Sequence, residues 1–155
     1  MQGQSASQAI KPYLFFDGRC DEALEFYTRT LGARVEQLFR FKDAPPPPPD
    51  AQPQEGCGPV TAEMAEKVMH ACVTIRGTMV FVSDGMCQGK AEFKGVSLAL
   101  ELPTDAEAET AFAALAEGGQ VQMPMGPAFF ASRFGMVADR FGVSWMITSP
   151  APARA

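Results

Sequence analysis

The order of expected elements repeats once along the chain, and this repeat limits the possible folds more than any other feature of the sequence. A strand, a helix and three further strands come first, and the same order returns in the second half. LGARV (31–35) aligns with EGGQV (117–121), and Phe26 then falls at the same offset as Phe112. A unit of one helix and four strands is too small to bury a sheet face alone, so the two units are expected to share one structure.

Local signals set the expected bounds of these elements. Gly32 stands where a glycine commonly ends a helix, and Thr104 with Glu107 forms a capping box that opens the second helix. Glycine turns at 76–77 and 141–142 lead into the last strand of each half. Apolar alternation and aromatic content predict strands at 11–16, 35–41, 68–75 and 78–85, and again at 95–103, 121–125, 133–139 and 143–149.

These elements predict an α+β fold of two tandem βαβββ modules, with cupped mixed sheets that form a cleft. The helices are expected to cover one face of each sheet, and the other faces to line the cleft. The predicted domain spans 10–148, with module one at 10–85, module two at 95–148, and disordered tails at 1–9 and 149–155. Residues 43–60 include five consecutive prolines, which predict an exposed loop of polyproline character, or alternatively a docking motif for a partner.

Composition excludes several classes of function. The net charge of −5 argues against nucleic-acid binding, which needs a basic patch or stripe. No apolar run is long enough to span a membrane, and MQGQSASQAIK has no signal-peptide pattern, so we expect a cytoplasmic protein that does not bind membranes. Four cysteines without a CxxC pair and a single histidine, His70, argue against a zinc site and favour free thiols.

Six segments resemble the PhnB-like branch of the vicinal oxygen chelate superfamily: PYLFFDGRCDEALEFYTRTLGA, KVMHACVTI, SDG, GVSLALEL, FAALAEGGQVQMPM and SRFGMVADRFGVSWMI. That superfamily includes glyoxalase I, extradiol dioxygenases, and fosfomycin- and bleomycin-resistance proteins. The resemblance covers residues 10–148 and implies a glyoxalase-like fold and a homodimer. PhnB-like proteins are often labelled 3-demethylubiquinone methyltransferases, but no glycine-rich strand-to-helix loop suited to S-adenosylmethionine is visible here.

Enzymes of this superfamily typically hold a divalent metal with His, Glu or Gln from the first and last strands of each module. Strong oxygen or nitrogen donors would have to converge on one point. By register, the corresponding positions here are Pro12, Phe81 or Ser83, Ser97 and Met146; a shift of one residue gives Tyr13, Val82, Leu98 and Trp145. We therefore expect neither a divalent metal nor another cofactor; a different metal site using His70, Asp84 or Glu101 is the alternative.

Alternation along the strands predicts which side chains face the cleft. The expected ligand-binding residues are Leu14, Phe16, Cys72, Phe81, Ser83, Ser97, Phe129, Phe130, Arg133 and Met146. His70 and Glu101 are the candidate catalytic acid or base residues. His70, Glu101 and Arg133 each have a structural alternative. In these alternatives His70 is bonded to a neighbouring strand or loop, Glu101 is paired with Arg133 or with solvent, and Arg133 forms a salt bridge to Asp139 or Asp84.

The expected function is binding of a small, partly apolar ligand in the cleft, with the reaction unassigned. One alternative is a sequestering protein of the resistance type that performs no catalysis. Others are a metal-dependent lyase or dioxygenase, and the methyltransferase of the family label. Aromatic walls and an acidic balance would suit a sequestering protein with a cationic ligand, whereas an enzyme needs at least one positioned titratable group.

Overall fold

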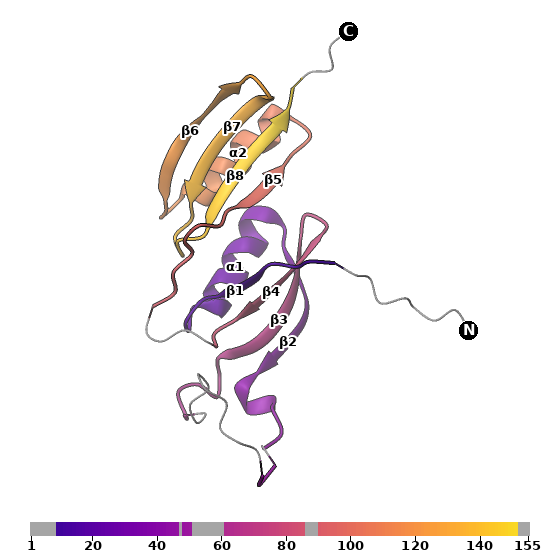
Figure 1. The fold of residues 1–155 in the computed structure, drawn as a ribbon, viewed down its shortest axis with the longest axis vertical. Helices are drawn as coiled ribbons and strands as arrows, with labels where there is room; N and C mark the ends of the chain where they lie inside the picture. Colours follow the sequence, from indigo (N-terminus) through magenta and orange to yellow (C-terminus); the bar gives the residue numbers. More distant parts are fainter. Residues whose placement is uncertain (1–8, 47, 51–60, 86–89, 152–155) are drawn as a thin grey trace, which may run out of the picture.

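The computed structural model describes residues 9–46, 48–50, 61–85 and 90–151. Module one contains β1 (Tyr13–Phe15), α1 (Cys20–Leu31), β2 (Arg34–Arg40), the short 3-10 helix η1 (Phe41–Asp43), β3 (Val68–Ile75) and β4 (Thr78–Ser83). Module two contains β5 (Leu98–Glu101), α2 (Asp105–Ala116), β6 (Gln120–Ala128), β7 (Ala131–Ala138) and β8 (Ser144–Pro150). The predicted order of two βαβββ modules is confirmed (Figure 1).

Each module forms one mixed four-stranded sheet, and the two strand orders are equivalent. The orders are β1-β4-β3-β2 and β5-β8-β7-β6. In each sheet the first strand runs parallel to the last, and the other neighbours are antiparallel. The predicted α+β class with mixed sheets is therefore confirmed.

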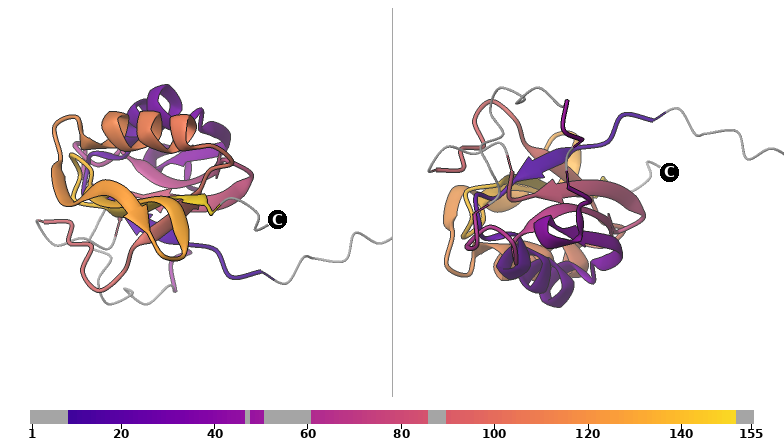
Figure 2. Two further views of the ribbon diagram at one scale, coloured as in Figure 1. Left: turned by 90° about the horizontal axis from the view of Figure 1, so that it is seen from above. Right: turned by 90° about the horizontal axis from the view of Figure 1, so that it is seen from below.

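Both helices lie on the same side of the molecule, and the uncovered faces of the two sheets share the opposite side (Figure 2). We call these uncovered surfaces the open faces. Each helix packs an apolar stripe against its sheet because its buried residues recur at intervals of three and four. The buried stripes are Ala23, Leu24, Phe26, Tyr27 and Leu31 in α1, and Ala108, Ala111, Phe112 and Leu115 in α2.

The predicted helix ends agree with the structure. Gly32 adopts a left-handed conformation with φ of 68°, and its N–H donates to the Thr28 carbonyl, which ends α1. Thr104 accepts a hydrogen bond from the Glu107 N–H, which opens α2.

The predicted domain bounds differ slightly from the structure. β8 continues to Pro150, beyond the predicted end of module two at residue 148, and there it pairs with Ala131. Most of the two predicted tails, and residues 47 and 51–60 of the proline-rich segment, lie outside the described residues. In the part of the chain that the structure describes, no helix combines the length and apolar composition needed to cross a membrane.

One hydrophobic core runs through both modules. The ring centroids of Tyr27 and Trp145 lie 5.7 Å apart, and those of Phe26 and Phe141 also lie 5.7 Å apart. These pairs join α1 of module one to the β7–β8 hairpin of module two, so the two modules share one core. The shared core holds the two sheets with their open faces on the same side of the molecule (Figure 2).

Candidate functional site

An aromatic patch lies on the open face of the first sheet. Tyr13 and Phe15 of β1 stack with their ring centroids 4.7 Å apart. Phe81 of β4 lies 5.8 Å from Tyr13, and the His70 ring of β3 lies 5.1 Å from Phe81. We refer to Tyr13, Phe15, His70 and Phe81 as the aromatic patch. Its ring faces suit a planar or apolar small molecule.

His70 connects Tyr13 to Cys72 through its two ring nitrogens. The Tyr13 Oη atom lies 2.8 Å from His70 Nδ1, and the Cys72 Sγ atom lies 3.5 Å from His70 Nε2. His70 and Cys72 share one side of the sheet because they are two residues apart on β3. The Cys72 thiol is free and half-buried. These three groups are close enough to exchange a proton.

The local environment keeps the Tyr13 phenol neutral. Burial raises the pKa of Tyr13 above its ordinary value. Lys11 Nζ lies 5.4 Å from the centroid of the Phe81 ring, so one border of the aromatic patch carries a positive charge.

The open face of the second sheet carries a row of methionines. Met123 pairs in register with Met136, and Met136 pairs with Met146, across β6, β7 and β8. Farther along the same face, Glu101 pairs with Thr148. Methionine side chains adapt to irregular apolar shapes, so this face also suits a small apolar molecule.

Two cavities adjoin module two. One of about 500 Å³ is lined by residues 93–97 together with Gln122, Met136 and Ser144. Within it, Ser97 Oγ donates to Ser144 Oγ at 2.7 Å. The second, of about 330 Å³, lies between the modules and is lined by Pro12 and the β3–β4 hairpin on one side and by residues 97–101 on the other.

The structure groups the predicted site residues by module. His70, Cys72, Phe81 and Ser83 share the open face of the first sheet, and Ser97, Glu101 and Met146 belong to the open face of the second. Ser83 is 3% exposed, and its hydroxyl already donates a hydrogen bond to the Met69 carbonyl at 2.6 Å. The functional roles of all these residues remain predictions.

The expected orientation of Leu14 and Phe16 is wrong. Both are buried, at 6% and 2% exposure, and Phe16 packs against Phe141 with a centroid distance of 5.7 Å. The register pairs Tyr13 with Phe81, so Tyr13 and Phe15 face outward. Sequence reasoning missed these two residues because β1 is only three residues long, and an apolar run such as YLFF alternates plausibly in either frame.

The expected position of Arg133 in the cleft is also wrong. Its Nε atom donates to Glu109 of α2 at 3.1 Å, so the guanidinium lies on the helix side of the sheet. From Arg133 to Ala138 the pairing with β8 is regular, so Arg133 shares the helix-side face with the buried Gly135 and Val137. Neither of its expected partners, Asp84 or Asp139, forms this ion pair.

Phe129 and Phe130 form the tip of the β6–β7 hairpin. Phe129 is 98% exposed, whereas the ring of Phe130 packs edge-on against Phe134, with centroids 5.2 Å apart. The two phenylalanines therefore differ in position: Phe130 extends the open face of module two, and Phe129 projects into solvent.

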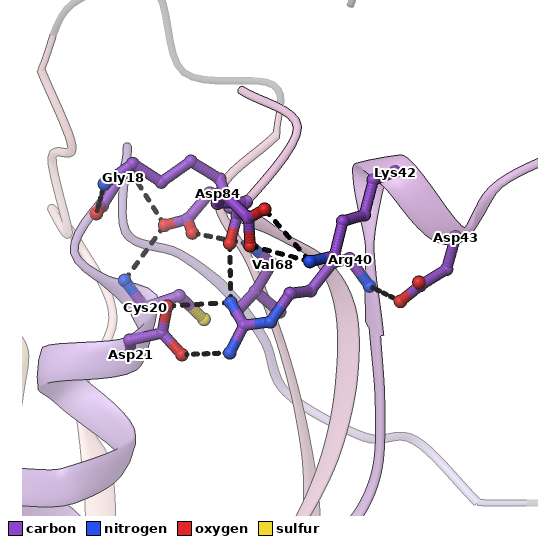
Figure 3. Close-up of polar contacts among 10 residues, drawn as sticks. Gly18, Cys20, Asp21, Arg40, Lys42, Asp43, Val68 and Asp84 are labelled. Atoms are coloured by element: carbon purple, nitrogen blue, oxygen red, sulfur yellow. Dashed lines mark hydrogen bonds and ion pairs between the residues drawn. The ribbon is translucent and has the colours of Figure 1, made fainter. Parts of the chain in front are cut away.

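Asp84 has a structural place at the start of α1 (Figure 3). Its carboxylate accepts from the backbone N–H groups of Gly18, Cys20 and Val68 at 2.8, 2.9 and 3.0 Å. Burial raises the pKa of the Cys20 thiol, because this side chain lies in the core. Asp84 therefore fixes the helix to the sheet, and Cys20 is a protonated core residue.

Beside this carboxylate, Arg40 forms a two-pronged ion pair with Asp21 of α1. Both N–O distances are 2.9 Å, and this pairing lowers the pKa of Asp21 (Figure 3). Among the described residues, no three His, Cys, Asp or Glu side chains converge in a manner that could hold a metal ion.

The paired modules and their two open faces define a glyoxalase-like protein. A glyoxylase/bleomycin resistance protein/dioxygenase domain from Frankia has the same fold, with 15% identity, a TM-score of 0.57, and coverage of 97% of this chain and 96% of that one. A family model described as 3-demethylubiquinone-9 3-methyltransferase matches residues 8–148. The chain belongs to this family, and its predicted place in the PhnB-like branch is confirmed.

Three relatives are similar along almost their whole length. Protein PA1353 from Pseudomonas aeruginosa is 40% identical, with a TM-score of 0.76 over 93% of this chain and 98% of that one. A PhnB protein from Bacillus cereus, described as a putative 3-demethylubiquinone-9 3-methyltransferase, is 28% identical. Its TM-score is 0.71, over 92% of this chain and 99% of that one. Protein YjdN from Escherichia coli (strain K12) is 36% identical over 138 residues, which are 89% of this chain and 92% of the relative.

Proposed function

We propose that the protein binds a small, partly apolar molecule on its open faces and that it does so without a divalent metal. The aromatic patch is the observation that carries this proposal. It exposes stacked rings beside protic groups and the Lys11 ammonium, a combination that favours a planar molecule with a polar or anionic edge.

The chemistry of the open faces supports the metal-free part of the proposal. At the positions expected by register for the superfamily's ligands, this chain holds Pro12, Phe81 or Ser83, Ser97 and Met146, and these side chains include no carboxylate or imidazole. Hard divalent cations prefer carboxylate and carbonyl oxygens, and borderline cations such as zinc prefer imidazole or thiolate. We expect ligand affinity to be unchanged by a chelator.

Binding is tested by calorimetric titration with 1-naphthoate, a planar apolar anion. We expect saturable binding that Phe81→Ala weakens about fivefold or more, because one stacking partner is lost. The matched control is Phe129→Ala, which removes an equally large but solvent-exposed ring and should leave affinity unchanged. Equal affinities of the protein and the Phe81→Ala variant would contradict the proposal.

A catalytic role is supported by the protic pair of His70 and Tyr13, and a purely sequestering role by the apolar open faces. Loss of turnover in His70→Ala with retained ligand affinity would establish catalysis.

We do not propose methyl transfer, because the connection between β1 and α1 holds a single glycine, Gly18, whose carbonyl accepts from Lys67 Nζ at 3.0 Å. This connection offers no glycine-rich cradle for S-adenosylmethionine.

We also propose a homodimer in the cytoplasm. Large apolar side chains are exposed on or beside the sheets, including Phe39, Met123 and Phe130 at 39%, 45% and 53%. Apolar groups of this size commonly mark an interaction surface. Sedimentation equilibrium should give about twice the chain mass of 16.6 kDa; a monomer at micromolar concentration would contradict this.

A further inference from the structure

We propose that Cys72 is a nucleophile, that His70 activates it, and that it adds to conjugated carbonyl compounds that rest on the aromatic patch. Only the recognition of the planar body rests on the function proposed above. Activation of the thiol stands on the Cys72–His70–Tyr13 geometry alone, so each part can fail separately.

The first argument is placement. Cys72 is half-buried on the open face, and its sulfur lies 3.5 Å from the His70 nitrogen that can take its proton. Cys20 is the internal contrast, because it is fully buried and its described polar contacts include no histidine. A nucleophile beside a base that is itself oriented by a third group is the arrangement that thiol catalysis requires.

The second argument is the tautomer of His70. If Nδ1–H donates to Tyr13 Oη, the Nε2 lone pair faces the Cys72 thiol and can accept its proton. The strand partners of the two residues carry no charge. On β2 the partners of Cys72 and His70 are the uncharged Gln37 and Phe39, and on β4 the partner of Cys72 is Phe81.

Charged groups near the pair come from other segments. Lys11 Nζ lies 5.4 Å from the centroid of the Phe81 ring, so a positive charge borders the patch. Glu36 of β2 is held by Arg34 at 2.7 Å and by the Thr74 hydroxyl at 2.9 Å, so its negative charge is largely compensated. The charged groups named here are therefore a lysine at the border of the patch and a glutamate already paired with Arg34.

The addition is balanced without an oxidant or a cofactor. The Cys72 S–H proton moves to His70 Nε2, and the thiolate sulfur bonds to the β-carbon of the conjugated carbonyl. The electrons of the carbon–carbon double bond move toward the carbonyl oxygen and form an enolate. The His70 imidazolium then protonates the enolate, so the net result is addition of S and H across the double bond.

The test uses two maleimides, which are conjugated carbonyl compounds of different size. In a Cys57→Ser, Cys87→Ser background, N-phenylmaleimide and N-methylmaleimide are reacted separately at pH 7, and adducts are located by mass spectrometry. We expect a single adduct at Cys72. His70→Gln should slow both reagents about tenfold or more and leave their rate ratio unchanged, because the base serves any electrophile.

The aromatic patch is tested by the same pair of reagents. N-phenylmaleimide should react faster than its methyl analogue, and Phe81→Ala should lower that rate ratio, because stacking of the phenyl ring is lost. If Phe81→Ala leaves the rate ratio unchanged while His70→Gln still slows both reagents, recognition by the aromatic patch is overturned and activation of Cys72 is not. Equal rates in the His70→Gln variant and its parent would overturn activation of Cys72.

A second measurement avoids reliance on a folded His70 variant. Because His70 is the only histidine, its ring nitrogens give a single set of ¹⁵N signals. We expect the Nδ1–H tautomer in the protein, and a shift toward Nε2–H in Tyr13→Phe, which keeps the ring but removes the hydroxyl. A predominant Nε2–H tautomer in the unmodified protein would contradict the proposal, because Nε2 could then not accept the thiol proton.

Discussion

At the scale of single residues, Asp139 joins the two modules. Its carboxylate accepts from the backbone N–H groups of Phe141 and Val143 at 2.9 and 3.1 Å. It also accepts from Tyr27 of α1 at 2.5 Å and from the Trp145 indole at 2.9 Å. Burial raises the pKa of Tyr27 well above its usual value, so this phenol stays protonated and donates.

Loss of this carboxylate should be costly. Asp139→Ala leaves four buried donors without their acceptor, and we expect it to lower the free energy of unfolding by about 3 kcal/mol or more. Tyr27→Phe removes one donor and leaves the others paired, so its expected cost is about 1 kcal/mol. Urea denaturation measures both, and similar costs for the two variants would contradict the role given to Asp139.

Contacts of this kind mark the limit of the sequence-based predictions. Gly32, Thr104 and Glu107 act on their own helices, so local spacing was enough to find them. Asp139 meets Tyr27 across 112 positions in the chain, and Arg133 meets Glu109 rather than either expected acid. In the site, alternation placed His70 and Cys72 correctly on one face of a long strand, whereas three residues of β1 did not reveal their register.

At the scale of elements, a carboxylate links the end of the last strand to the start of the helix in each module. In module one the carboxylate belongs to the strand side, and in module two it belongs to the helix. After β4, the Asp84 carboxylate accepts the N–H groups at the start of α1. In β8, the roles are reversed, because the Ser149 hydroxyl donates to Asp105 of α2 at 2.6 Å. Ser132 of β7 donates to the same carboxylate at 2.8 Å.

This contact makes part of the stability depend on pH. The hydrogen bond from Ser149, followed by that from Ser132, lowers the pKa of Asp105 in the folded protein. A carboxyl group with a lowered folded-state pKa stabilises the fold above its unfolded pKa, and that contribution is lost as the pH falls through the folded pKa. Ser149→Ala should therefore destabilise the protein more at pH 7 than at pH 3, as measured by urea denaturation.

The control is Asp105→Asn, which cannot titrate. In this background the effect of Ser149→Ala should be the same at both pH values, because the coupled ionisation is gone. A Ser149→Ala effect that is independent of pH with Asp105 present would show that this hydrogen bond does not favour the ionised carboxylate.

At the scale of the whole molecule, each module places an arginine against an aromatic ring of the other module. The Arg19 guanidinium of module one lies 4.6 Å from the centroid of the Phe141 ring. In the opposite direction, Arg140 of module two lies 4.4 Å from the ring centroid of Phe26. Phe141 also contacts Phe16 and is only 7% exposed. With one continuous core, the two modules should unfold as one cooperative unit.

This cooperativity can be measured with the single tryptophan. Trp145 of β8 packs against Tyr27 of α1, so its fluorescence reports the contact between the modules, whereas far-UV circular dichroism reports both modules as a whole. We expect the two urea transitions to coincide. Phe141→Ala should lower the free energy of unfolding by about 3 kcal/mol and separate the two midpoints, because the shared core loses its central ring. Separate midpoints in the unmodified protein would contradict a single cooperative unit.

Two edge strands of the described sheets, β2 and β6, carry features that oppose pairing with a strand of another molecule. β2 and β6 stand at the outer ends of the sheet orders, where exposed backbone N–H and C=O groups could pair with a strand of another molecule. β6 contains Pro124 and Pro127, which supply no N–H, and three irregularities in its register break the row of hydrogen-bonding groups. β2 instead carries Arg34, Glu36 and Arg40. At these two edges, growth into fibres is thus discouraged, at β6 by missing donors and at β2 by charge.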